Sequence, residues 1–224
     1  KVANATPSNI WVVDTAGNAL NNGSVALPFK TIQAVIDAAV LGDTIILNNG
    51  VYYENLELIS KSLVIKAKNK GKAVIQPANS SAPLMTIRDK NPWGVTTNYD
   101  KPKNKFFGIN FSGSSRTNWD NNGPNTAIYF TENADPYFEA CQFLNNTSTT
   151  LMWFDQSAPT FVNCVIRNNN NSSGLMGGWG DSSYARTKIA KFVNSTITNN
   201  SLMLMNNFNS DKSVVFFNCI IKWK

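Results

Sequence analysis

The sequence predicts an all-β chain wound into a parallel β-helix, a solenoid, with a short N-terminal capping α-helix. Similar segments recur along the chain, among them FVNCVIRNNN at 161–170 and FVNSTITNNS at 192–201. Apolar residues alternate within each segment, which is the period of a strand. The strands are short and are joined by turns rich in Asn, Ser and Gly, so they can bury their apolar faces only by stacking on one another.

The N-terminal region, residues 10–50, differs from the repeats and is predicted to cap the first coil. Residues 10–14, IWVVD, have the pattern of a strand. A helix is expected at about residues 30–41, ended by Gly42, because one face of it would carry Ile32, Val35, Ile36 and Ala39. An amphipathic helix can cover the apolar end of a solenoid. Residues 51–224 are then the coils, and the whole chain, 1–224, is expected to be one domain.

The repeats have a nearly fixed length. When Ile109, Cys141, Cys164, Ser195 and Cys219 are taken as equivalent, the spacings are 32, 23, 31 and 24 residues. A base period of about 23 residues, lengthened twice by about eight, indicates stacked coils. A second short apolar strand is expected at 126–130, 149–154, 173–177 and 201–205.

Two residue types are assigned structural roles by their place in the repeat. Paired asparagines recur at 145/146, 168/169 and 199/200, and are predicted to form a ladder of turn hydrogen bonds. The odd number of cysteines argues against a disulfide framework, so they are expected to stack inside the coil as small apolar residues.

The composition argues against a membrane-spanning protein and a nucleic-acid-binding arm, and it limits the kind of metal site that the chain could form. No apolar run approaches the roughly 18 residues of a membrane helix, so no membrane span is expected. The net charge of +6 comes from scattered residues without the basic run of a nucleic-acid arm, and fits either ordinary surface lysines or an acidic polysaccharide partner. The chain has no His, so a metal site would need oxygen ligands.

The segment from IWVVD through PFKTIQAVIDAAVLGDTIILNNGVYYENLELISKSLVI, at 10–65, resembles the opening of bacterial secreted proteins of the pectin-lyase-like, right-handed parallel β-helix superfamily. The later F-x-N-C-x-I-x-N-N units resemble the coil repeats of the same superfamily. The resemblance implies a secreted or cell-surface protein, bacterial or from a phage particle, with polysaccharide or another glycan as partner. It does not select an activity, because the superfamily includes lyases, hydrolases, epimerases, tailspikes and non-catalytic proteins. The chain stops at NCIIKWK without a recognisable cap, so truncation is expected, with the remainder of a longer chain contacting the last coil.

A cleft is predicted where long loops interrupt the repeat. Two long connections, 88–105 and 177–188, flank two short ones, 131–136 and 155–159, and all four are expected along one edge. The walls would carry the carbohydrate-binding candidates Trp93, Tyr99, Trp179 and Tyr184, together with Arg186. The floor would carry Glu132, Asp135 and Asp155, as calcium ligands or as an acid and base. In the alternative interpretation, the Trp residues cover their own loops and the carboxylates accept hydrogen bonds from turn amides.

Three functional hypotheses remain open. A polysaccharide lyase would use a basic side chain to abstract a proton, with Arg186, Lys188 and Arg167 as candidates and calcium as an optional aid. A glycoside hydrolase would use two of the floor carboxylates. A non-catalytic surface module would bind glycan through its loops, and the lack of a lyase motif favours it. A further insertion, 114–125, offers Trp119 and Asp120 as a second candidate binding site on another edge.

Overall fold

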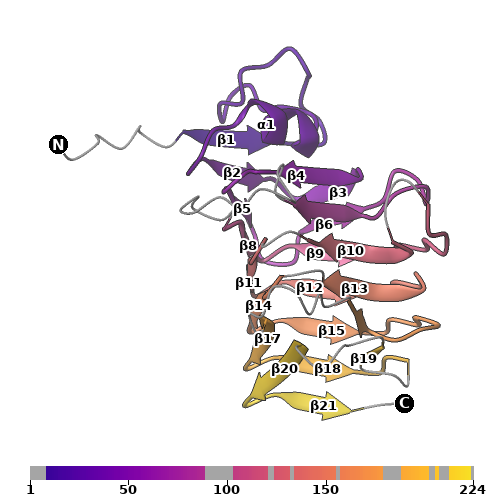
Figure 1. Cartoon of the computed structure of the whole chain (residues 1–224). Helices are drawn as coiled ribbons and strands as arrows, with labels where there is room; N and C mark the ends of the chain where they lie inside the picture. Colours follow the sequence, from indigo (N-terminus) through magenta and orange to yellow (C-terminus); the bar gives the residue numbers. More distant parts are fainter. Residues whose placement is uncertain are drawn as a thin grey trace, which may run out of the picture.

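The computed structural model describes residues 9–88, 103–120, 124–131, 134–154, 157–178, 188–201, 205–206 and 212–222. The chain winds about one axis in stacked coils, and its strands form three sheets that run along this axis (Figure 1). Neighbouring strands within each sheet are parallel and belong to successive coils, as in the register of β11, β14 and β17. The prediction of a parallel β-helix is therefore confirmed.

Each full coil contributes one strand to each sheet. Sheet A contains β1 (Ile10–Val13), β2 (Thr44–Leu47), β5 (Val64–Ala67), β8 (Lys105–Phe107), β11 (Tyr137–Glu139), β14 (Thr160–Val162), β17 (Lys188–Val193) and β20 (Lys212–Phe217). Sheet B contains β3 (Gly50–Tyr53), β6 (Ala73–Gln76), β9 (Asn110–Ser112), β12 (Gln142–Leu144), β15 (Val165–Arg167), β18 (Thr196–Thr198) and β21 (Ile220–Lys222). Sheet C contains β4 (Leu56–Ile59), β7 (Met85–Arg88), β10 (Thr126–Phe130), β13 (Thr150–Phe154), β16 (Met176–Gly177) and β19 (Met205–Asn206).

The first strand expected in each repeat is in fact two strands. In FVNCVIR, β14 ends at Val162 and β15 begins at Val165, and Asn163 between them has a φ of 53°. This left-handed conformation turns the chain from sheet A into sheet B. Gly108, Ala140, Asn194 and Asn218 have the same conformation at the equivalent corner. Alternation alone could not reveal the bend, because the apolar residues on both sides of it face the same core.

The core consists of side chains stacked from coil to coil. On sheet A, the ring centroids of Phe138 and Phe161 are 5.0 Å apart, and those of Phe161 and Phe192 are 4.5 Å apart. On sheet B, Phe111 and Phe143 stack at 5.2 Å. In-register parallel pairing places identical residues above one another, so each repeat buries the face of its neighbour.

The paired asparagines form the expected ladder at the turn from sheet B to sheet C. The side-chain amide of Asn146 donates to Oδ1 of Asn169 at 2.9 Å, and that of Asn169 donates to Oδ1 of Asn200 at 3.0 Å. The same two amides also donate to the backbone carbonyls of Phe111 and Phe143. All three side chains are buried, so the ladder satisfies polar groups that would otherwise face an apolar core.

The cysteines are free thiols. Cys141 and Cys164 are buried in successive coils, and Cys219 in the last described coil is half-buried. Burial raises the pKa of the Cys141 thiol, and it raises that of Cys164 to about 12. The first two therefore serve as small core residues, as the sequence predicts.

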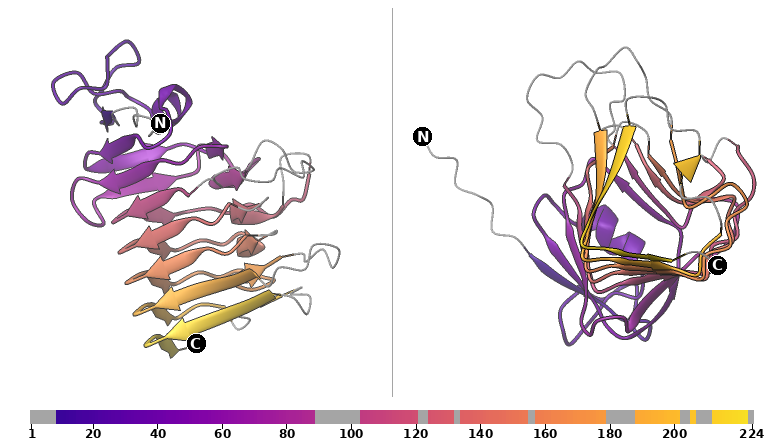
Figure 2. Two further views of the ribbon diagram at one scale, coloured as in Figure 1. Left: turned by 60° about the vertical axis from the view of Figure 1, so that its left-hand side comes forward. Right: turned by 90° about the horizontal axis from the view of Figure 1, so that it is seen from below.

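Helix α1 (Ile32–Ala38) lies across the N-terminal end of the coil, as seen along the axis in the right-hand view of Figure 2. Its buried residues Ile32, Val35 and Ile36 are those expected from the sequence. The predicted end at Gly42 is wrong, because the helix stops at Ala38 and Ala39 is extended. The buried carboxylate of Asp43 accepts hydrogen bonds from the backbone N–H of Val40 and the indole of Trp11, which holds this segment in a turn.

Among the described residues, α1 is the one helix, and no helix is long and apolar enough to cross a membrane.

Candidate functional site

The four connections that interrupt the repeat leave one sheet and enter one other. They follow β7, β10, β13 and β16, which are consecutive neighbours in sheet C, and they lead to β8, β11, β14 and β17, which are consecutive neighbours in sheet A. The strand ends that these connections join therefore share one edge of the solenoid, as predicted, while most residues of the two long connections lie outside the described ranges. The two long connections are three coils apart, or about 14 Å at roughly 4.8 Å between strands.

The outer face of sheet C carries a row of side chains that runs down the solenoid. Strand register aligns Glu57, Thr86, Tyr129, Trp153 and Gly177 in successive coils. In β13 the flanking residues Met152 and Phe154 belong to the buried core, so alternation turns Trp153 outward. At the N-terminal end of the row, Glu57 forms an ion pair with Arg88, whose Nη2 lies 3.4 Å from Oε1 of Glu57. Later coils contribute the aromatic residues Tyr129 and Trp153 to the row.

Trp153 is nevertheless almost covered, because a segment from another part of the coil lies over it. The rings of Trp119 and Trp153 meet edge to face, with centroids 5.3 Å apart and an interplanar angle of 82°. Trp153 is 4% exposed, whereas Trp119 is 49% exposed. The insertion between β9 and β10 thus places an exposed indole on the outer face of sheet C. We call Trp119 and Trp153 the aromatic platform.

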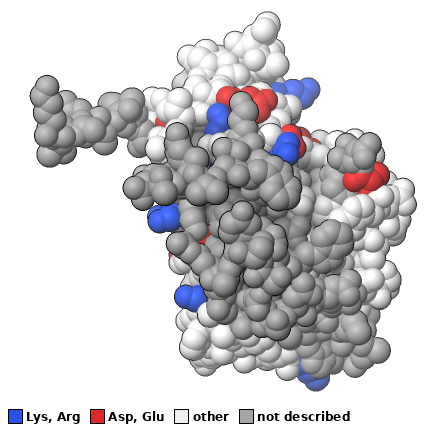
Figure 3. Space-filling model, in the orientation of Figure 1, with Lys and Arg blue, Asp and Glu red and all other residues white. Residues whose placement is uncertain are grey.

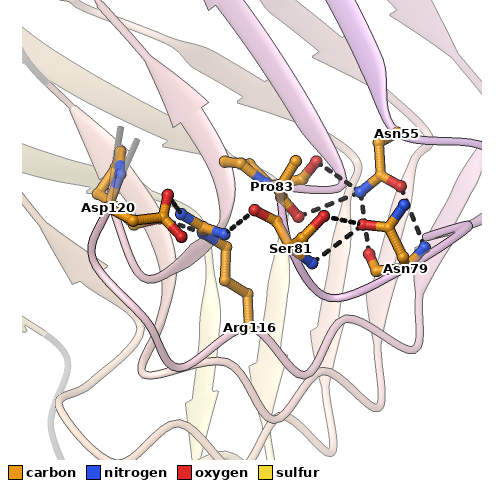
Figure 4. Close-up of polar contacts among 8 residues, drawn as sticks. Asn55, Asn79, Ser81, Pro83, Arg116 and Asp120 are labelled. Atoms are coloured by element: carbon orange, nitrogen blue, oxygen red, sulfur yellow. Dashed lines mark hydrogen bonds and ion pairs between the residues drawn. The ribbon is translucent and has the colours of Figure 1, made fainter. Parts of the chain in front are cut away.

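A buried arginine anchors the insertion that carries Trp119 (Figure 4). The Arg116 side chain is fully buried, and its Nε donates to the carbonyl of Pro124 at 2.9 Å. Its Nη1 donates to the carbonyl of Ser81, in the preceding coil, and its Nη2 pairs with Oδ1 of Asp120 at 2.8 Å. Because one guanidinium bonds three separate backbone or side-chain groups, both ends of the insertion are fixed to its neighbour.

The turn that receives Arg116 is itself held by hydrogen bonds. Nδ2 of Asn55 donates to the carbonyls of Asn79, Ala82 and Pro83, at 3.2, 3.1 and 3.0 Å. Oδ1 of Asn79 accepts the backbone N–H of Ser81 at 3.0 Å. Figure 4 shows these groups continuing the network away from Arg116. The platform therefore rests on a rigid edge of the solenoid.

Most of the residues predicted to line the cleft lie outside the described residues. These are Trp93, Tyr99, Glu132, Asp155, Trp179, Tyr184 and Arg186. Lys188 begins β17 in sheet A, and its backbone pairs with Lys212. The predicted cleft thus remains a prediction.

Asp135 and Arg167 can be placed. Asp135 lies in the short connection before β11, and its Oδ1 accepts the backbone N–H of Ala158, in the next coil, at 2.7 Å. This is the turn-amide contact of the alternative interpretation, and it does not test a further role. Arg167 is exposed at the end of β15 in sheet B, so its strand belongs to neither of the two sheets that the four connections join.

The charges visible among the described residues are dispersed over the face drawn in Figure 3. Within the described ranges, no three acidic or Cys side chains come close enough together to hold a metal ion. Two of the three proposed calcium ligands, Glu132 and Asp155, are outside those ranges. Calcium binding therefore also stays a prediction.

Sequence reasoning missed Trp153 and Arg116. Trp153 lies in TTLMWF, whose apolar character indicated only a core strand, and the alternation within that strand is the signal that could have turned it outward. Nothing in the sequence distinguishes Arg116 from a surface arginine, because its partner Ser81 belongs to another coil and Pro124 comes close only when the insertion folds back.

The structure is similar to that of the pectate lyase Pel9A, with a TM-score of 0.65 and 20% identity over 96% of this chain. The chain has the pectin-lyase-like, right-handed parallel β-helix fold. A rhamnogalacturonan lyase matches this β-helix with a TM-score of 0.60 and 14% identity over 96% of the chain. The PL6 family alginate lyase AlyGC matches it with a TM-score of 0.54 and 18% identity over 94% of the chain.

The β-helix described here is shorter than these proteins. It spans 54% of the pectate lyase, 62% of the rhamnogalacturonan lyase and 29% of the alginate lyase. No protein-family model matches the sequence, and a comparison with curated proteins finds no match. At these identities the likeness shows the fold alone.

Proposed function

We propose that this chain belongs to a secreted or cell-surface protein that binds polysaccharide on the outer face of sheet C. The observation that carries the proposal is the aromatic platform, in which a half-exposed Trp119 is held over Trp153 by a fully buried arginine. Flat indole rings suit the C–H faces of sugars, and a ring that is fixed beforehand loses little conformational entropy on binding.

The position of the platform on the solenoid supports the same proposal. Trp153 lies in sheet C, from whose strands the four interrupting connections leave. Successive coils rise by roughly 4.8 Å, which is close to the length of one monosaccharide, so a glycan lying along the row would meet one coil per sugar. The similar structures include enzymes named for pectate, rhamnogalacturonan and alginate, which supports a glycan as the ligand class.

Affinity gels test this proposal. The chain is run through gels that contain pectate, alginate, chondroitin or an uncharged glucan, with calcium and with a chelator. Binding by the platform predicts retention by at least one polymer, and a several-fold loss of that retention in Trp119→Ala. The matched control is Tyr53→Ala, which removes another exposed aromatic side chain from sheet B. Equal retention of wild type and Trp119→Ala would contradict the proposal.

The same polymers in solution separate binding from catalysis. A lyase would release unsaturated uronate products, which absorb in the ultraviolet, and a hydrolase would release reducing ends. Retention without product supports a binding module. Unsaturated products would instead identify a lyase, with Arg186 and Lys188 as the candidate bases. New reducing ends would identify a hydrolase, with Glu132, Asp135 and Asp155 as the candidate carboxylates.

A further inference from the structure

Strands β5 and β8 of sheet A, together with the turn from β5 to β6 in sheet B, present five exposed lysines on the outer surface. We call this surface the lysine corner, and it consists of Lys66, Lys68, Lys70, Lys72 and Lys105. It is separate from the aromatic platform, because the platform lies on the outer face of sheet C. We propose that the lysine corner is a second binding surface, and that its ligand is a carboxylate-bearing polysaccharide chain.

Strand register brings the first two lysines together. In β5 and β8, Lys105 pairs with Val64, and Lys66 pairs with Phe107. Ile65 and Phe106, which lie between these positions, are fully buried. Alternation therefore turns Lys66 and Lys105 to the same outer surface, on neighbouring strands and two residues apart in register.

The backbone fixes the remaining three lysines. They lie in the turn from β5 to β6, where the N–H of Lys68 donates to Leu47 O at 2.8 Å and that of Lys72 donates to Asn69 O at 3.0 Å. Between them, the N–H of Gly71 donates to Gly108 O at 2.6 Å and ties the turn to the next coil. The ammonium groups are thus carried on an ordered edge.

Little negative charge opposes them. Within the part of the chain that the structure describes, none of the five lysines forms a salt bridge. Glu139 is the carboxylate that the neighbouring strand β11 presents to this face, and it already accepts a hydrogen bond from the hydroxyl of Tyr137 at 2.9 Å. Five ammonium groups beside one engaged carboxylate produce a positive potential, which attracts anions.

The chemistry between the lysines favours a sugar chain over other polyanions. Phe107 and Tyr137 lie beside Lys66 and Lys105 in register, with ring centroids 6.1 Å apart. Both rings are half-buried, so they offer small areas of apolar surface rather than the fully exposed faces on which nucleic-acid bases stack. A uronate polymer has carboxylates that alternate with C–H surfaces. Its carboxylates would lie near the ammonium groups, and its C–H surfaces would contact the two rings.

The test compares two double variants with the same change in net charge. Lys66→Gln/Lys105→Gln removes two lysines of the corner, and Lys30→Gln/Lys222→Gln removes two exposed lysines elsewhere. Binding to polygalacturonate is measured at low and at physiological salt. The corner variant is expected to bind about three- to tenfold more weakly at low salt, with a smaller difference at physiological salt, because exposed charge pairs are weak and screened. The control variant is expected to bind like wild type.

The other outcomes overturn the inference. Equal losses in both double variants would mean that net charge alone matters, and failure of wild type to bind polygalacturonate would remove the ligand. Tighter binding to single-stranded DNA than to polygalacturonate would replace the polysaccharide by a nucleic acid. The inference stands apart from the proposed function, because Trp119→Ala and an uncharged glucan report on the aromatic platform without altering the lysine corner.

Discussion

Arg116 and Asp120 form an ion pair that is buried on one side only. The guanidinium is fully buried, the carboxylate side chain is 41% exposed, and Nη2 lies 2.8 Å from Oδ1. The pair therefore joins the interior of the solenoid edge to the exposed end of the insertion, where Trp119 lies. Its two partners contribute unequally, because only Arg116 also bonds the backbone carbonyls of Ser81 and Pro124.

This asymmetry predicts different costs for the two partners. Arg116→Met should lower the free energy of unfolding by about 2–3 kcal/mol, because the buried carbonyl of Pro124 and the carbonyl of Ser81 both lose their donor. Asp120→Asn should cost at most about 1 kcal/mol, because the lost partner is partly solvated. Denaturant titration followed by tryptophan fluorescence measures both. Equal costs would show that the carbonyl contacts contribute little.

The asparagine ladder predicts that substitutions of two adjacent asparagines, Asn169 and Asn170, differ strongly in their effect on the free energy of unfolding. Asn169→Ala should destabilise the fold by about 1–3 kcal/mol, because it leaves buried amides and carbonyls of two coils unpaired. Asn170→Ala is the matched control, since its side chain is exposed, and it should change stability by less than about 0.5 kcal/mol. Thermal denaturation followed by circular dichroism distinguishes them. A similar shift in both variants would assign the effect to the turn rather than to the ladder.

The thiols should react in the order of their burial. Burial raises the pKa of Cys141, and it raises that of Cys164 to about 12, so neither forms the reactive thiolate near neutral pH. Cys219 is half-buried and should be the first to be modified. Iodoacetamide labelling of the native chain, read by peptide mass spectrometry, gives the order, and labelling in denaturant provides the control. Rapid labelling of Cys141 in the native chain would contradict the packing of the core.

We expect the contribution of Asp43 to the stability of the N-terminal region to be lost at low pH. Burial acts to raise the pKa of Asp43, but hydrogen bonds from the Trp11 indole and from the backbone of Asn9 and Val40 outweigh it and hold the pKa below its usual value. A carboxyl with a lowered folded-state pKa contributes stability above its unfolded pKa, about 3.9, and loses it as the pH falls through the folded value.

The variant Asp43→Asn tests this prediction. Its deficit in unfolding free energy relative to wild type should be constant from about pH 5 to 8 and should shrink below about pH 4. Chemical denaturation across this range measures the deficit. A deficit that does not depend on pH would mean that only the shape of the side chain matters at this turn.

The architecture follows from patterns that are local in the sequence. The spacing of Cys141, Cys164, Ser195 and Cys219, the alternation within each strand and the paired asparagines all repeat once per coil. A solenoid consists of nearest-neighbour contacts, so a local pattern that repeats is sufficient to specify it. The buried face of α1 could be read from Ile32, Val35 and Ile36 for the same reason, since helical spacing is local.

The bends at the corners, the capping of the helix and the position of the aromatic platform depend on contacts that no local pattern predicts. The N-terminus of α1 is capped by the carboxylate of Glu54, which accepts the N–H groups of Ile32 and Gln33, and α1 ends early because Asp43 bonds Val40. Trp119 meets Trp153, and Arg116 meets Ser81, from different coils. None of these contacts joins equivalent positions of the repeat. They depend on which insertion folds back over which sheet, and that is settled by burial and hydrogen bonding in three dimensions rather than by local pattern.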